Sequence, residues 1–216
     1  MKSNEGLQKE VQNTIQWEPL LSAAEIGVIA KDGVITLSGT VDSYGKKMQA
    51  EEATKNVLGV KAIVVNIDIE FGSRYSKGDN EIADEILAAY KRDWKIPEDK
   101  VKIKVEKGWV TLDGEFYWHY QKDAAMDSIR NLPGVMGVTN NITIKAAILD
   151  EIEKEAIESA LQRSWAFHES DIKIDVSGTH ITMRGKVASW YEKDEAARIV
   201  WKTPGVGIVN NELVID

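Results

Sequence analysis

The sequence predicts an α+β fold built as three tandem αββαβ units, each a three-stranded mixed sheet with two helices on one face. Two short motifs recur three times along the 216 residues. Copies 1 and 2 of both motifs lie 75 residues apart, and copies 2 and 3 lie 71 residues apart. Since two independent motifs keep one register, the chain repeats one structural unit. The motifs are centred on the glycines Gly39, Gly114 and Gly185 and on Gly59, Gly134 and Gly205.

The first element of each unit is predicted to be an amphipathic helix. Leu7, Val11 and Ile15 recur every four residues, which is typical of one apolar stripe on a helix. The second copy repeats the spacing with Ile82, Ile86 and Tyr90.

A β-hairpin is expected next. In "KVKIKVEKGWVTLDG" apolar residues alternate with lysines up to a turn at Lys107-Gly108, and alternation resumes with Val110 and Leu112. Gly114 and its equivalents fall on the core-facing side of the second strand, where we expect close approach of a helix to require glycine.

The second helix and third strand complete the unit. The helix is expected to start near Ser43, Trp118 and Ser189, and Ser189 with Glu192 matches a capping box. It is expected to end by the glycine of the second motif. Because a helix joins strands two and three, these strands can run parallel through a right-handed crossover.

The repeat sets the predicted organisation of the chain. Residues 1–70 form unit 1, 71–80 a linker, 81–145 unit 2 and 148–216 unit 3. The linker "FGSRYSKGDN" is rich in glycine, serine and charge, which is typical of a flexible joint.

This order of elements resembles the BON domain family (bacterial OsmY and nodulation). The resemblance rests on the V/I-x-L-x-G-x-V pattern of the second strand and on the Gly-Val pair before an Asn-containing last strand, in three copies over nearly the whole chain. It implies a non-enzymatic module of bacterial envelope and osmotic-stress proteins that contacts phospholipid or other envelope components. Family members are usually exported.

Composition excludes several classes of protein. The formal net charge of −8 opposes generic binding to nucleic acid, and the absence of cysteine excludes disulfides and thiolate chemistry. The N-terminal residues show no apolar signal-peptide core, and no apolar run is long enough to span a membrane. The chain as it stands is therefore expected in the cytoplasm, or in the periplasm if a leader has been removed.

No catalytic, metal or cofactor site is predicted. The three histidines, His119, His168 and His180, occupy non-equivalent positions of the repeat. A repeated metal site is thereby excluded, and one composite site would need all three units to converge. No phosphate-binding loop, nucleophile elbow or EF-hand loop is present. We therefore expect a protein that is not an enzyme.

The aromatic residues divide into two predicted groups. Trp17, Trp94 and Trp165 end the first helix of their units and are expected in the core, as is Phe116. A second group gathers where the second strand meets the second helix: Tyr44, Tyr117, Trp118, Tyr120, Trp190 and Tyr191.

This junction group has two interpretations. Trp118 replaces the capping serine of the other units, which costs about 1 kcal/mol, so a compensating contact is expected. Packing between units is favoured over an external ligand, because small linked units must cover one another's apolar surface.

Unit 2 also carries a basic and aromatic surface. Lys100, Lys102 and Lys104 are predicted on the outward face of its first strand, with Trp109 on the same side. Protection of an edge strand against association explains the lysines. Recognition of anionic lipid headgroups, at about 1 kcal/mol per lysine, is the functional alternative.

Two functional hypotheses follow. The first is a non-catalytic envelope or stress-associated module that binds phospholipid, a membrane surface or envelope proteins through Lys100, Lys102, Lys104, Trp109, Tyr117, Trp118, Tyr120, Trp190 and Tyr191. The second is a protein-interaction scaffold or self-assembling repeat protein without lipid binding, for which homo-oligomerisation stays open.

Overall fold

The structure, a computed structural model, describes residues 2–21, 26–72, 77–145, 154–164, 167 and 172–215. The described elements follow the order αββαβ three times. Unit 1 comprises α1 (Asn4–Gln16), β1 (Ile26–Lys31), β2 (Val34–Val41), α2 (Tyr44–Lys55) and β3 (Ala62–Ile69). Unit 2 comprises α3 (Asp79–Arg92), a 3-10 turn (Glu98–Lys100), β4 (Val101–Glu106), β5 (Trp109–Phe116), α4 (His119–Asp127) and β6 (Gly137–Ile144). Unit 3 comprises α5 (Lys154–Gln162), β7 (Ile172–Ser177), β8 (His180–Val187), α6 (Trp190–Trp201) and β9 (Ile208–Ile215).

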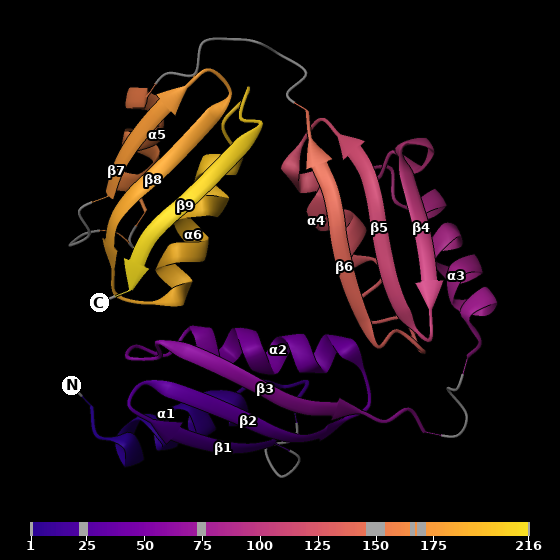
Figure 1. Ribbon diagram of the computed structural model, residues 1–216, viewed down its shortest axis with the longest axis horizontal. Coiled ribbons are helices and arrows are strands. Elements are labelled where there is room, and N and C mark those ends of the chain that lie inside the picture. The colour runs from indigo at the N-terminus through magenta and orange to yellow at the C-terminus, as the bar shows by residue number, and fades with distance from the viewer. Residues whose placement is uncertain are drawn as a thin grey trace.

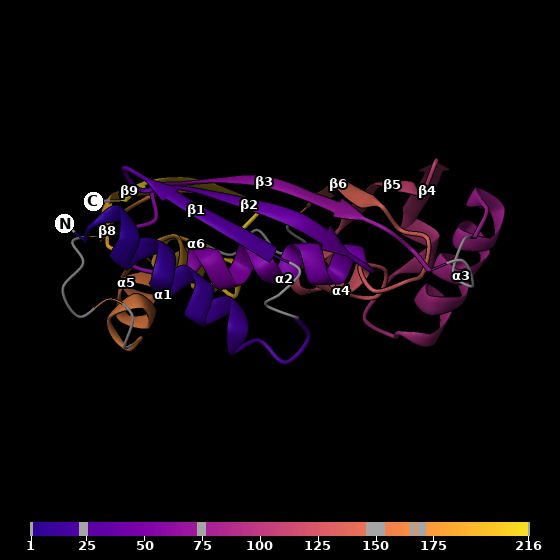
Figure 2. The ribbon, with the colours of Figure 1, turned by 90° about the horizontal axis from the view of Figure 1, so that it is seen from below.

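Each unit has one three-stranded mixed sheet, which confirms the predicted fold class. The central strands β2, β5 and β8 pair antiparallel with the preceding strand and parallel with the following one. In Figure 2 the sheets lie along the upper side and the helices below them. Figure 1 shows the three units around a common centre, with α2, α4 and α6 on the inner side and α1, α3 and α5 on the outer side.

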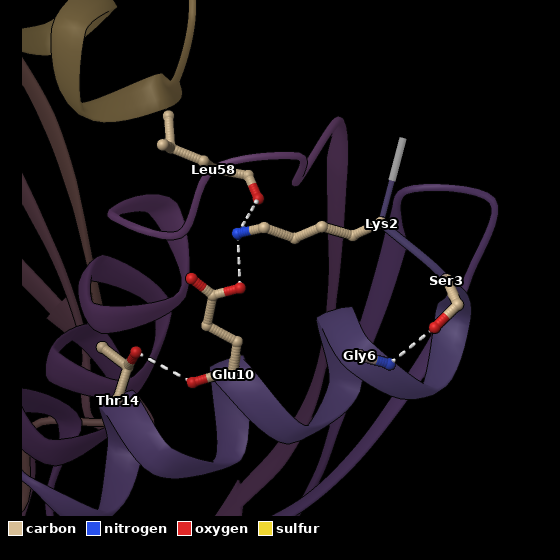
Figure 3. A network of polar contacts seen from close by, with 6 residues as sticks. All are labelled: Lys2, Ser3, Gly6, Glu10, Thr14 and Leu58. Carbon is tan, nitrogen blue, oxygen red and sulfur yellow. Dashed lines mark hydrogen bonds and ion pairs between the residues drawn. The ribbon is translucent and has the colours of Figure 1, made fainter.

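Helix α1 illustrates how local sequence sets an element. The Ser3 hydroxyl accepts a hydrogen bond from the Gly6 amide at 3.1 Å and caps the helix, as Figure 3 shows. Lys2 pairs with Glu10 and donates to the Leu58 carbonyl at 3.3 Å, which ties the helix to the turn after α2. The predicted stripe of Leu7, Val11 and Ile15 is buried against the sheet.

The hairpin turn of unit 2 also agrees with the sequence. Lys107 and Gly108 both have positive φ, 52° and 76°, as the two central residues of a type I′ turn require. Asp79 at the start of α3 accepts hydrogen bonds from both amides, at 2.8 and 2.9 Å. The first helix therefore fixes the tip of the hairpin.

The expected reason for the strand glycines was wrong for Gly114. A Cβ atom there would clash with the backbone of Lys100 and approach the Val101 Cα to 3.2 Å. The chain entering the edge strand β4, rather than a helix, excludes a side chain at this position.

The expectation that the helix-terminal tryptophans lie in the core was also wrong. Trp17 and Trp94 are 86% and 85% exposed, and Trp165 lies outside the described residues. The chain turns after the helix and buries a later residue instead. These core residues occupy equivalent positions of the repeat: Leu21, Ile96 and Phe167.

Candidate functional site

The outward face of unit 2 holds two of the predicted lysines, Lys102 and Lys104, together with Trp109, and each lysine has an acidic neighbour. Lys102 lies opposite Asp113 in the strand pairing, and the Lys104 ammonium pairs with Glu106 at 2.8 Å. The hydrogen bond to Glu106 raises the pKa of Lys104. The surface therefore presents less net positive charge than the run of lysines in the sequence indicates.

Trp109 lies across the neighbouring strand of this face. Its ring occupies the space that a Cβ at Gly137 would need, and its indole N–H donates to the Thr139 hydroxyl at 2.8 Å. Trp109 is still 51% exposed. It combines a structural contact with an accessible ring edge.

Lys100 differs from the other two lysines. It ends the 3-10 turn before β4 instead of lying in the strand, and its ammonium stands 3.8 Å from the centre of the Tyr117 ring. Because of this cation–π contact, the Lys100 ammonium and the face of the Tyr117 ring are both less available to a ligand. Tyr117 remains 42% exposed.

Trp118 occupies the N-cap position of α4 without a side-chain cap. Ser189 accepts from the Glu192 amide at 3.1 Å, and Ser43 accepts from the Lys46 amide at 3.4 Å. A capping box has two hydrogen bonds, one to the side chain of the N-cap residue and one from its backbone amide. At Trp118 the structure shows the second of these, in which the Gln121 side chain accepts from the Trp118 amide at 3.0 Å. The predicted loss of one cap is therefore present in the structure.

The first residue of α2, α4 and α6 is aromatic in every unit and contacts the next unit. Tyr44 packs against the core of unit 2, where burial raises the pKa of its hydroxyl and a hydrogen bond to the backbone of Val138 opposes that rise. The His119 imidazole stacks on Trp201 of unit 3, with ring centres 4.5 Å apart.

The third contact closes the arrangement. Trp190 packs against the core of unit 1 and donates its indole N–H to the Lys61 carbonyl at 3.3 Å. Each inner helix thus begins against the end of the inner helix of the next unit: α2 on unit 2, α4 on unit 3 and α6 on unit 1 (Figure 1). The three units form a ring with approximate threefold symmetry.

Three lysines at equivalent positions of the inner helices α2, α4 and α6 bond the neighbouring strands, and the sequence reasoning missed them. Lys47, Lys122 and Lys193 donate to the carbonyls of Ile67, Ile142 and Leu213 at 2.8, 2.6 and 2.7 Å. Each therefore satisfies one backbone carbonyl of β3, β6 or β9. Burial lowers the pKa of Lys122, and the nearby Asp123 opposes that change. Their 75- and 71-residue spacing was the signal that could have found them.

Tyr120 and Tyr191 are second residues of their helices, where unit 1 has Gly45. Tyr120 is 49% exposed. Together with Trp118 and His119 it lines a cavity between units 2 and 3, whereas Tyr191 lines one between units 3 and 1. In that second cavity desolvation raises the pKa of Asp194, and Lys55 of unit 1 opposes the rise.

The predicted site residues thus fall into separate regions. Lys102, Lys104 and Trp109 lie on the outward sheet face, Trp118 and Tyr120 at the junction of units 2 and 3, and Trp190 and Tyr191 at the junction of units 3 and 1.

Over the part of the chain that the structure describes, no group of three or more His, Cys, Asp or Glu side chains could hold a metal ion. His119 bonds Asp123 through Nδ1 at 3.0 Å, and His168 lies outside the described residues. Every described helix falls short of the length and apolarity that a membrane crossing requires.

The repeat geometry defines a three-unit α+β protein, and comparison with known proteins gives its family. Residues 3–70, 78–146 and 150–216 each match the BON domain, so the chain belongs to the BON domain family. The resemblance inferred from the sequence is confirmed.

Individual relatives are distant. The chain is 28% identical over 129 residues to Osmotically-inducible protein Y of Escherichia coli (strain K12), a match covering 58% of this chain and 64% of that protein. The matched region therefore spans less than two thirds of the relative's length.

Among solved structures, the chain resembles CdsD, described as a structural protein of the type III secretion system of Chlamydia trachomatis. The match has 14% identity and a TM-score of 0.27, covering 96% of this chain and 91% of that one. The CdsD C-terminal domain gives 13% identity and a TM-score of 0.26, with both chains fully covered. These scores are too low to support an argument about function.

Proposed function

We propose that this protein is a non-catalytic, osmotic-stress-associated component of the bacterial envelope that binds phospholipid surfaces. Its BON family membership and its similarity to a protein named as osmotically inducible support the association with envelope stress.

The exposure of Trp17 and Trp94 is the observation that carries the lipid proposal. Both follow the first helix of their unit, and both leave more than four fifths of their surface in solvent. Tryptophan combines an apolar ring with a polar N–H, which suits the headgroup region of a bilayer. Leu20, 62% exposed, adds apolar surface beside Trp17.

The charges around Trp94 favour anionic lipid. Along the sequence, Lys91, Arg92 and Lys95 lie within three residues of Trp94 and are exposed, and Asp93 is the acidic residue in the same interval. Glu98 and Asp99 follow, also exposed, and reduce the local positive charge. A basic side chain close to an anionic membrane contributes about 1 kcal/mol. The net charge of −8 opposes this attraction, so we expect weak, salt-sensitive binding.

Trp17 and Trp94 follow α1 and α3, which lie on the helix side of the molecule, whereas Trp109 belongs to strand β5 of the sheet layer (Figure 2). We favour the helix side, because Lys102 and Lys104 on the sheet face already have acidic neighbours.

Co-sedimentation with vesicles of phosphatidylglycerol and phosphatidylcholine at low salt tests both faces. We expect the wild type to bind, Trp94→Ala combined with Trp17→Ala to lose most of the binding, and the matched control Trp109→Ala to retain it. Loss of binding in Trp109→Ala but not in the double variant would place the membrane contact on the sheet face. Absence of binding by the wild type would contradict the lipid proposal.

A self-assembling scaffold is the second candidate, and the edge strand β1 favours it. Exposed positions of β4 and β7 carry Lys102, Lys104, Lys173 and Asp175, whereas β1 exposes Ile29 at 61%. The charged residue of β1, Lys31, lies at the end of the strand, so the exposed positions before it, Gly27 and Ile29, carry no charge that opposes pairing with another strand. Light scattering over a concentration series that shows a defined oligomer, lost in Ile29→Lys, would favour this function.

A further inference from the structure

The junction between units 2 and 3 contains a cavity of about 290 Å³. Four aromatic side chains from both units, together with charged groups, surround it. The lining residues are Trp118, His119, Tyr120, Asp123, Arg198, Trp201 and Lys202.

The equivalent position between units 3 and 1 has a cavity of about 260 Å³ with different chemistry. Its lining includes Glu52, Lys55, Asp194, Glu195 and Arg198, so charged groups of both signs face one another. Between units 1 and 2, Gly45 replaces the tyrosine, and Asn131 occupies the space where a Cβ would project. Only one of these three equivalent positions is therefore walled mainly by rings.

The aromatic wall departs from the repeat at two residues that otherwise support the helices. Trp118 stands where units 1 and 3 have a capping serine. Trp201 stands where units 1 and 2 have Lys55 and Arg130, cations that favour a helix C-terminus. Residues that stabilise a helix end are commonly replaced at functional positions. Here both replacements, Trp118 and Trp201, line the same cavity.

The charges of the cavity indicate the polarity of its ligand. Among the described residues that line the cavity, Asp123 is the acidic side chain, and it shares a hydrogen bond with His119 Nδ1 at 3.0 Å. Arg198 and Lys202 contribute two positive charges. The Arg198 guanidinium already forms an ion pair with Glu195, in which Nε donates to the carboxylate at 2.6 Å. Lys202 is thus the principal cation for a ligand to reach.

We propose that this cavity binds a small planar anion, an aromatic ring system carrying a carboxylate or a comparable acidic group. The rings of Trp118 and Tyr120 contact the flat apolar part, and the acidic group lies toward Lys202. A cavity of this size holds one bicyclic aromatic acid. The proposal is independent of lipid binding, because the cavity involves neither Trp17 nor Trp94.

Isothermal titration calorimetry with 2-naphthoate tests it, with uncharged 2-naphthamide as the comparison ligand. We expect saturable one-to-one binding of naphthoate by the wild type and binding about tenfold weaker by Trp118→Ser. Trp109→Ser, the same substitution outside the cavity, should bind as the wild type does. Lys202→Gln should weaken naphthoate while leaving naphthamide unchanged.

Thermal unfolding of the same variants separates binding from folding. Since serine restores the missing cap, Trp118→Ser should unfold at a temperature about 2–4 °C higher while losing ligand. Trp201→Lys provides a second test by introducing the unit 1 residue, and it should also lose binding. Absence of one-to-one binding in the wild type, or wild-type affinity in Trp118→Ser and Trp201→Lys, would overturn the proposal.

Discussion

The junctions of unit 1 with unit 2 and of unit 2 with unit 3 use the same helix ends but differ in how closely they pack. At the first, Tyr44 reaches the core of unit 2, and Gly45 leaves room for Asn131. At the second, Tyr120 takes the place of the glycine, and a cavity remains beside the stacked rings of His119 and Trp201. The second residue of the helix is therefore one of the positions that distinguish the two junctions, because Gly45 allows the close approach of Asn131 that Tyr120 does not.

The largest effect is expected from Gly45→Tyr, which gives the first junction the residue of the other two. The new side chain would meet Asn131 and the Arg130 carbonyl, which lies 3.3 Å from the Cβ position. Overpacking of this kind costs about 1–3 kcal/mol. Urea denaturation should show this loss. Asn131→Ala in the same chain should recover part of it, and additive losses would contradict the close contact.

A smaller effect is expected from the caps, which contrast unit 3 with unit 2. Ser189→Ala removes the bond from the Glu192 amide and should lower the free energy of unfolding by about 1 kcal/mol. Trp118→Ala removes no cap and should leave the start of α4 unchanged by amide hydrogen exchange, whereas the start of α6 exchanges faster in Ser189→Ala. Equal exchange at both helix starts would show that capping does not distinguish these units.

The smallest effect is expected from Tyr44→Phe, which removes one hydrogen bond from the junction of units 1 and 2. The free energy of unfolding should fall by about 0.5–1 kcal/mol at neutral pH. Because the folded protein raises the pKa of Tyr44, its contribution is complete below the unfolded pKa of about 10 and is lost as pH rises through the folded value. Stability measured from pH 8 to 11 should therefore fall more steeply in the wild type than in Tyr44→Phe. Parallel curves would contradict a half-buried Tyr44 hydroxyl that bonds the backbone of Val138.

Much of each unit was predictable, because periodicity and capping are local. The stripe of Leu7, Val11 and Ile15, the turn at Lys107 and Gly108, and the cap at Ser189 follow from neighbouring residues. The exposure of Trp94 did not follow. A pattern that ends at the helix terminus cannot show that the chain turns and buries Ile96 in place of the tryptophan.

Contacts between units were predictable only in part. The excess of aromatic residues at the helix starts indicated packing or recognition, but nothing in the spacing shows which unit each ring meets. The contact of Trp190 with Lys61 joins residues 129 positions apart. Such a contact depends on how whole units are placed, and no single-unit pattern encodes that placement.

Closure of the ring between units 3 and 1 is the central claim, because no linker joins these units directly. Since the sequence contains no cysteine, Lys31→Cys and Lys173→Cys would place unique spin labels on β1 and β7. Pulsed electron paramagnetic resonance should give one narrow distance distribution in this pair and a broad one when Trp190→Ala is added. A broad distribution with Trp190 intact would show that units 3 and 1 do not hold together.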